Sequence, residues 1–303
     1  MRFTDFIVLF SLFAFLLSSL YLLWLNLPQE TIEFKSYNAE ITENLSLKSS
    51  QFYPRMRYRN SEISYNLEEN CSLKKQKDLE EAVRTLEQKT ILKFYKSDEP
   101  EIIITCSNIQ PKDDERNFFI AGEGGPTLVI NATKYSVILE GKISLYRAEN
   151  CETPQVAIHE LLHSLGFDHN NNKKSIMYPV TDCEQEIDEY IIEEIKELYS
   201  ENSEPDLVIE KVEANKTGSY VNLEVSMSNQ GLQDIKNSSL KIIIKNDLIK
   251  NFDVGSFDIG SKRTLNIKNL KIPKETTEIT IITKTEKIET NEENNVAKIH
   301  LSQ

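Results

Sequence analysis

Only four of the 303 residues are cysteine, and only four are histidine. Four cysteines are too few for a disulfide-built scaffold, so an apolar core must provide most of the folding free energy. Basic residues are outnumbered as well, because 35 Lys and Arg face 48 Asp and Glu, a net charge of −13. Proteins that bind nucleic acids or anionic membrane surfaces by electrostatics need a basic surface, so we predict no nucleic-acid partner.

The acidic excess is confined to one part of the chain. Residues 51–204 carry 18 basic and 29 acidic residues, whereas residues 205–303 carry 14 of each. The length is sufficient for two domains with separate cores. The step in charge predicts a domain boundary near residue 204.

The N-terminal segment lacks charge altogether over 22 positions, residues 6–27. That length can cross about 30 Å of hydrocarbon, and Tyr21 and Trp24 near its end are typical of an interfacial aromatic belt. A cleaved signal peptide is the alternative, but no small-x-small cleavage site follows the apolar run. We predict a transmembrane signal anchor over residues 1–28, in a single-pass protein of the cell membrane with its remaining residues extracytoplasmic. Arg2 favours a cytoplasmic N-terminus.

Residues 29–55 are polar and without a clear period, which predicts a stalk. An extracytoplasmic location is mildly supported by the even number of cysteines and by N-x-[ST] sequons. The sequons begin at Asn44, Asn70, Asn131, Asn215 and Asn237.

The pattern over residues 56–203 predicts a domain with a mixed sheet and helices. The apolar spacing of residues 73–89 predicts an amphipathic helix with Ser72 as its N-cap. A polar loop is expected at 111–126. The expected strands are 62–67, 91–95, 101–105, 127–130 and 135–146.

Two further helices are predicted in the same domain. The first begins at Thr153 and Pro154 and stops at Gly166. The second begins at Asp182, with Gln185 completing a capping box, and its acidic outer face is interpreted as a solvated surface.

Residues 204–303 show six short alternating segments separated by Gly, Asn, Asp or Pro. This pattern predicts an all-β immunoglobulin-like sandwich. The segments are 206–212, 221–228, 239–245, 263–272, 277–284 and 295–301.

Three of the four histidines lie in the sequence HELLHSLGFDH, which starts at His159. On a helix, His159 and His163 share one face and can bind the same metal ion. Glu160 can face a metal-bound water and accept its proton. Gly166 lets the chain turn so that His169 becomes a third ligand. Three nitrogen ligands leave the fourth tetrahedral position open, which is typical of catalytic zinc.

This sequence, followed by Ser175-Ile-Met-Tyr-Pro179, resembles the metzincin zinc proteases and, among them, the matrixins. Only seven residues separate His169 from Met177, an interval that resembles matrixins more than the longer-looped families. The resemblance implies that Met177 is the Met-turn residue beneath the metal. It covers roughly residues 56–200 and implies a metzincin catalytic domain of the α+β/α/β class with a mixed twisted sheet.

The implied activity is that of a zinc metalloendopeptidase with one catalytic Zn²⁺, three histidine ligands and Glu160 as the general base toward a zinc-activated water. A protein or peptide substrate is expected to add to the sheet edge along part of 135–146, with Pro179 and the residues after it walling the specificity pocket. Whether calcium is bound is left open.

The chain also departs from the matrixin pattern. Matrixins typically hold a second, structural zinc with further histidines, but the only remaining histidine is His300. Residues 1–70 contain no cysteine, so latency through a pro-segment cysteine is excluded for this chain. The matrixin arrangement implies disulfides 71–106 and 151–183, the alternatives being two other pairings or four free thiols. These residues are Cys71, Cys106, Cys151 and Cys183.

The C-terminal 204–303 resembles the CARDB domain, a β-sandwich of prokaryotic surface proteins. The matching stretches are Pro205–Ile209, Val221–Leu232 and Glu289–Asn295. A surface ligand for this domain and a spacer role are both open. We therefore predict a membrane-anchored extracytoplasmic zinc endopeptidase; the alternative is a surface adhesion or scaffold protein whose zinc domain is proteolytically inactive.

Overall fold

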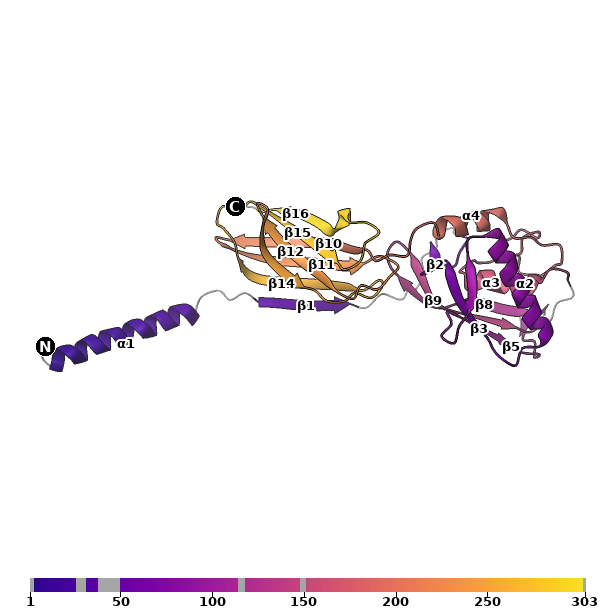
Figure 1. The fold of residues 1–303 in the computed structure, drawn as a ribbon, viewed down its shortest axis with the longest axis horizontal. Coiled ribbons are helices and arrows are strands. Elements are labelled where there is room, and N and C mark those ends of the chain that lie inside the picture. The colour runs from indigo at the N-terminus through magenta and orange to yellow at the C-terminus, as the bar shows by residue number, and fades with distance from the viewer. Residues whose placement is uncertain (1–2, 26–30, 38–49, 114–117, 148–150, 302–303) are drawn as a thin grey trace.

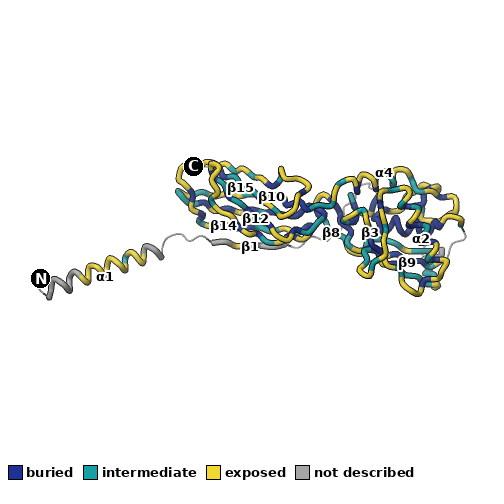
Figure 2. Tube along the Cα trace, viewed as in Figure 1, coloured by how far each residue is buried: buried dark blue, intermediate teal, exposed yellow. Residues whose placement is uncertain are grey.

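The computed structural model describes residues 3–25, 31–37, 50–113, 118–147 and 151–301. A central domain with mixed secondary structure is followed by an all-β C-terminal domain, and the two lie end to end (Figure 1). Each domain has its own apolar core, visible as the dark segments of Figure 2. The break between the last helix of the first domain and the first strand of the second falls at residues 199–206, where the step in charge also lies.

The N-terminal helix α1 spans Phe3–Leu25. Side-chain burial is described for residues 10–22 of this helix, and the large apolar side chains among them are exposed. Among the described residues, no helix is both long and apolar enough to cross a membrane. The predicted transmembrane helix is therefore not confirmed.

The predicted stalk is wrong in part. Residues 31–37 form strand β1 (Thr31–Tyr37), which pairs antiparallel with β14 (Lys262–Lys271) of the C-terminal domain. The open edge of β14 can accept another strand because its backbone groups need partners. Residues 38–49 of the stalk lie outside the described residues.

The central domain is built on one twisted sheet with the strand order β2-β9-β5-β3-β4, and β8 is added to β9. All neighbours are parallel except β8, which runs antiparallel to β9. The mixed sheet predicted from the sequence is thus present. Its strands are β2 (Met56–Tyr58), β3 (Glu62–Leu67), β4 (Lys93–Lys96), β5 (Ile102–Cys106), β8 (Gly122–Asn131) and β9 (Ser136–Leu145), and β6 (Lys112–Asp113) pairs separately with β7 (Phe118–Phe119).

Three helices accompany this sheet: α2 (Leu73–Lys89), α3 (Gln155–Ser164) and α4 (Glu189–Leu198). Helix α2 has the predicted bounds, and Ser72 Oγ accepts the backbone N–H of Lys75. It buries Leu79, Ala82 and Leu86 completely, and it packs against α3 as well as the sheet.

The predicted start of the last helix at Asp182 is wrong. The backbone N–H of Asp182 does donate to Gln185 Oε1, but the chain then makes a turn at 183–184 and a β-bridge at Glu186, and α4 begins only at Glu189. Glu186 forms backbone hydrogen bonds with Lys174 and Ile176, which hold this segment away from a helical conformation. Tertiary pairing therefore overrides a local helix-start signal.

The C-terminal domain is a sandwich of two antiparallel four-stranded sheets, with strand orders β1-β14-β11-β10 and β13-β12-β15-β16. All six predicted strands are present. Strand β13 was missed because most of its side chains are exposed, so its sequence shows no regular alternation. The bounds are β10 (Leu207–Thr217), β11 (Tyr220–Asn229), β12 (Ser238–Ile244), β13 (Asp247–Asp253), β15 (Glu278–Thr285) and β16 (Val296–His300), with the 3₁₀ helix η1 (Glu293–Asn295) before β16.

The two domains share a small apolar interface. Ala132, Tyr135 and Val137, at the β8–β9 turn and the start of β9, pack with Leu232 and Ile259 of the sandwich. Beside this cluster, one ion pair joins Arg59 to Asp234 at 3.2 Å.

Candidate active site

The histidine sequence begins on helix α3, which packs against the antiparallel edge strand β8. Every residue of α3 is buried. The helix begins after Pro154, whose ring suits a helix start, and the chain leaves it through Gly166. Gly166 has φ +97°, a backbone conformation that residues with a Cβ rarely adopt. This turn directs the following loop back toward the helix.

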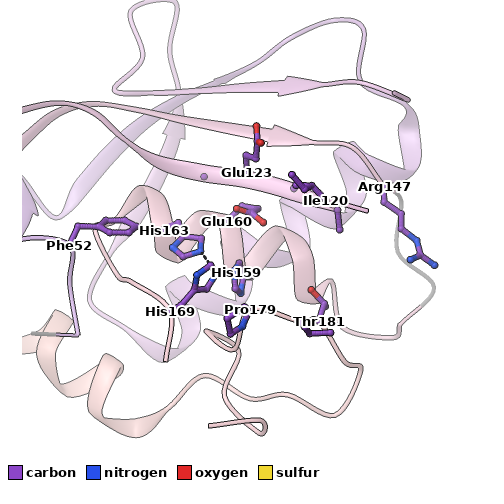
Figure 3. A pocket seen from close by; sticks show the side chains of 14 residues that line it. Phe52, Ile120, Glu123, Arg147, His159, Glu160, His163, His169, Pro179 and Thr181 are labelled. Atoms are coloured by element: carbon purple, nitrogen blue, oxygen red, sulfur yellow. Dashed lines mark hydrogen bonds between the residues drawn. The ribbon is translucent and has the colours of Figure 1, made fainter. Parts of the chain in front are cut away.

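The turn brings the three predicted histidines together. The possible ligand atoms of His159, His163 and His169 lie within 4.8 Å of one another. The Nε2 atom of His169 lies 3.1 Å from the Nε2 atoms of both other histidines (Figure 3). The i, i+4 spacing and the glycine turn thus bring the three imidazoles together.

In two of the three imidazole rings, the Nδ1 atom already has a hydrogen-bond partner. His159 Nδ1 lies 2.5 Å from the carbonyl oxygen of Ile176, and His163 Nδ1 lies 2.7 Å from that of Phe167. A carbonyl can only accept, so each Nδ1 carries the proton and each Nε2 directs a lone pair inward. Converging lone pairs repel unless a cation lies between them. Nitrogens about 2.0–2.1 Å from a tetrahedral ion lie about 3.3 Å apart, so the triad fits zinc.

Both helical histidines are held in the neutral form that binds metal. Burial lowers the pKa of His159 to about 3, with a further contribution from the charge of His163. Burial likewise lowers the pKa of His163 to about 4. At neutral pH protons therefore compete little for these two nitrogens.

Glu160 lies on the same helical turn, with 5% of its surface exposed. Burial, together with a smaller contribution from the negative charge of Glu123, raises the pKa of its carboxyl to about 8. A bound cation in the triad would lower this pKa again. The side chain faces the same cavity as the histidines (Figure 3).

The cavity in front of the triad has a volume of about 590 Å³. Phe52 lies beside His163, with ring centroids 5.7 Å apart, and Arg147 lies at the other end of the cavity (Figure 3). Pro179, which was predicted to wall the specificity pocket, lines this cavity together with Val180 and Thr181. The lining residues are Phe52, Ile120, Ala121, Gly122, Glu123, Gly124, Arg147, His159, Glu160, His163, His169, Pro179, Val180 and Thr181.

The predicted substrate strand is wrong. Strand β9, within the expected range 135–146, is paired on both sides, with β8 along one edge and with β2 and β5 along the other. Among the described strands, β8 pairs only with β9, so its other edge is free beside the cavity, which its first residues line. Residues 122–126, predicted as a loop, are the start of this strand.

Two glycines of β8 allow helix α3 to approach the strand closely. A Cβ atom on Gly124 would lie 2.3 Å from the backbone oxygen of Glu160, and one on Gly122 would lie 2.7 Å from its Cγ. Real Cβ atoms do not come that close. Helix α3 can therefore lie this near to β8 only because residues 122 and 124 have no side chain. The glycine run was visible in the sequence as a loop signal, whereas nothing marked Phe52 as a site residue.

The segment around Met177, next to the histidine triad, is held in place by several contacts. Met177 is fully buried in the core, and the carbonyl of the preceding Ile176 accepts from His159. The predicted disulfide 151–183 is present and connects the start of the α3 segment to the chain just beyond Met177. The second predicted disulfide, 71–106, joins the segment just after β3 to the last residue of β5, and these two strands are parallel neighbours as expected. His300 pairs with Glu278 in the other domain and takes no part in the site.

Comparison with known proteins assigns both domains. Residues 56–200 match the family model of the matrixins, and residues 204–299 match that of the CARDB domain. No curated protein matches the chain.

Two solved structures are similar to parts of the chain. A CARDB domain of Pyrococcus furiosus in complex with di-metal ions is 21% identical, covering 33% of this chain and 90% of that chain, with a TM-score of 0.27. High choriolytic enzyme 1, a hatching-enzyme zinc protease of the medaka fish Oryzias latipes, is 19% identical, covering 44% of this chain and 55% of that chain, with a TM-score of 0.27. The family matches, the assembled histidine triad and the β-sandwich agree on one assignment: residues 56–200 form a matrixin domain of the zinc metalloprotease type, and residues 204–299 form a CARDB domain.

Proposed function

We propose that the chain is a zinc-dependent endopeptidase whose ligands are His159, His163 and His169 and whose general base is Glu160. The observation that carries the proposal is the convergence of three Nε2 atoms at one end of a cavity that also receives a buried carboxyl. A purely structural zinc site has no need of such a carboxyl. The proteolytically inactive scaffold is therefore the weaker alternative.

The chemistry of amide hydrolysis decides what each group does. Zinc bound by the triad supplies Lewis acidity, which polarises the scissile carbonyl and lowers the pKa of water. Glu160 takes the proton of the attacking water and later delivers it to the leaving amine. A carboxyl with a pKa near neutral can do both. Burial of this group keeps bulk water from competing for the proton.

The free edge of β8 is the proposed binding site for the substrate backbone. An extended peptide adds to a sheet edge through main-chain hydrogen bonds, which are independent of sequence. The edge passes directly over Glu160 at Gly122 and Gly124, so a peptide paired there would place a carbonyl close to the triad. Side-chain preferences would come from the cavity walls, including Arg147 and Thr181.

The test of this function is removal and return of the metal. Dialysis against a zinc chelator is expected to abolish cleavage of an unfolded protein substrate, and one equivalent of Zn²⁺ per chain is expected to restore it. Cleavage measured by gel and by mass spectrometry of the fragments would show internal peptide bonds being cut. Full activity in protein from which zinc has been removed, verified by elemental analysis, would contradict the proposal.

We further propose that the chain acts outside the cytoplasm and is attached to the cell membrane through residues 6–27. Two disulfides support an oxidising compartment, and these 22 residues carry no charge. In that arrangement the CARDB domain would hold the protease near surface ligands. We expect the full chain to stay with membranes after a carbonate wash and a chain lacking residues 1–28 to be released. Release of both would contradict membrane attachment.

A further inference from the structure

Residues 50–52 precede the region that matches the matrixin family model and lie within the segment predicted as a stalk. They pair with residues 166–168, the turn that leads from α3 to the third histidine. Gln51 and Phe167 form an antiparallel bridge at the centre of this pairing. Backbone hydrogen bonds of 2.9 and 2.8 Å flank the bridge, from the N–H of Phe52 to the carbonyl of Gly166 and from the N–H of Asp168 to the carbonyl of Ser50.

This pairing fixes the peptide groups around Phe167. In an antiparallel bridge of this kind, the central residue directs its own N–H and C=O away from the partner strand. Those of Phe167 bond to α3 instead: the N–H donates to the carbonyl of Leu162 at 3.1 Å, and the C=O lies 2.7 Å from His163 Nδ1. The carbonyl that orients the second histidine is therefore held between α3 and residues 50–52.

The side chain of Phe52 contacts the same histidine directly. Its ring stacks on the His163 imidazole, with the centroids 5.7 Å apart and the planes inclined by 24° (Figure 3). Ring pairs at this separation attract each other. Phe52 remains 37% exposed whereas His163 is only 5% exposed, so the phenyl ring shields one face of the imidazole from water.

A buried glutamine holds residues 50–52 in place. The amide of Gln51, which is 3% exposed, accepts the backbone N–H of Met56 at 2.9 Å and donates to the carbonyl of Met56 at 2.8 Å. Met56 also packs against the glycine turn, since a Cβ atom on Gly166 would lie 2.8 Å from the Met56 Cβ. Residues 50–52, the start of β2 and the glycine turn thus form one closed set of contacts.

We propose that Gln51 and Phe52 are positioning residues of the metal site. His169 lies beyond the end of α3 and is exposed, so its placement depends on what holds the turn before it. Residues 50–52 hold that turn, and Phe52 restricts the rotation of the His163 ring. Groups that orient metal ligands in this way contribute to metal affinity, and their loss typically weakens binding about 10- to 100-fold. The inference rests on the proposed zinc site and adds residues from outside the matrixin match.

The test measures metal binding rather than cleavage, in the full chain carrying Glu160→Gln, which prevents self-digestion. The Kd for Zn²⁺ is measured by competition with a chromophoric chelator, and the visible absorption spectrum of the Co²⁺-loaded chain reports the ligand geometry. The Tm of the metal-free chain is measured in parallel. The variants are Phe52→Ala, Phe52→Tyr and Gln51→Ala, and the control is Tyr95→Ala, which removes an aromatic ring that is 51% exposed on β4.

Phe52→Ala is expected to raise the Kd for Zn²⁺ roughly tenfold and to alter the Co²⁺ spectrum, because the uncovered imidazole can turn and meets water. Phe52→Tyr keeps the stacked ring and should keep the parent values. Gln51→Ala should raise the Kd about 10- to 100-fold, since it releases the segment that pairs with the turn before His169. Tyr95→Ala should change neither the Kd nor the spectrum.

A role in stability alone would lower the metal-free Tm and leave the Kd and the Co²⁺ spectrum as in Tyr95→Ala. That result for both Phe52→Ala and Gln51→Ala would overturn this inference while the proposed zinc protease stands. If Gln51→Ala does not fold, Phe52→Ala decides, because its side chain is partly exposed and its loss leaves the core intact. A parent chain that binds no zinc would overturn the proposed function and this inference with it.

Discussion

Replacing Glu160 with glutamine is expected to lower kcat for peptide cleavage by roughly 10²- to 10⁴-fold, the usual contribution of a general base. Glutamine has the same shape but cannot accept a proton. Because residue 160 is not one of the three histidines, zinc content should stay at one ion per chain. KM should change little, since the substrate backbone binds along β8.

The matched control is Glu184→Gln, a glutamate-to-glutamine change at an exposed position of the same domain. It should leave kcat, zinc content and Tm unchanged. Activity of the Glu160→Gln variant within tenfold of the parent chain would mean that another group moves the proton. The proposed mechanism would then be wrong, even with zinc in place.

The same substitution has a pH-dependent effect on stability. Burial raises the pKa of Glu160 from 4.5 to about 8 in the metal-free fold, so the folded state resists ionisation that the unfolded state allows. Above pH 4.5 this difference lowers the free energy of unfolding, by about 3 kcal/mol at pH 7. Metal-free Glu160→Gln should therefore be the more stable protein at pH 7. Below pH 4.5 the two should converge in chemical denaturation.

Gly124→Ala is expected to impair both the fold and the activity of the protease domain. The new Cβ would lie 2.3 Å from the backbone oxygen of Glu160, and neither atom can rotate away, because the backbone of residue 124 fixes the Cβ and the oxygen belongs to the helix backbone. Overpacking of this kind costs about 1–3 kcal/mol. Separating α3 from β8 by about 1 Å also moves Glu160 relative to the substrate strand, which can reduce kcat about 10²-fold.

The neighbouring residue provides the control. A Cβ on Gly125 meets no atom within 4 Å, so Gly125→Ala should keep the Tm and kcat of the parent chain. Gly122→Ala should be intermediate, because its Cβ meets only the flexible Glu160 side chain and would displace that carboxyl without moving the helix. Equal Tm and kcat for the alanine variants at 124 and 125 would contradict a packing role for Gly124.

Local patterns in the sequence predicted much of this protein correctly. The zinc motif was recognisable because an i, i+4 spacing and a glycine turn determine ligand geometry within eleven residues. Helix α2 was predicted to the residue because both its cap and its apolar stripe are local. The alternating strands of the C-terminal domain followed from the period of 2, except β13, whose exposed side chains show none.

Long-range pairing was responsible for the errors. Nothing local distinguishes β8 from β9 as the free edge, since that depends on which strands occupy the other side of each. The glycines of 122–126 indicated a loop, whereas the structure uses two of them to admit a helix. Strand β1 exists through its pairing with β14, over two hundred residues away, and Asp182 failed as a helix start because Glu186 pairs with the chain near Ile176.

The sequence by itself indicated the candidate ligands, the candidate base and the order of the two domains, because each is encoded by neighbours along the chain. Only the tertiary structure decided the pKa of Glu160 and which strand edge and side chains face the cavity. Burial raises the pKa of Glu160, β8 presents the free edge, and Phe52 reaches the cavity from a segment that the sequence assigned to a stalk. Desolvation and strand pairing depend on all the surrounding chain, so no short window of sequence contains them.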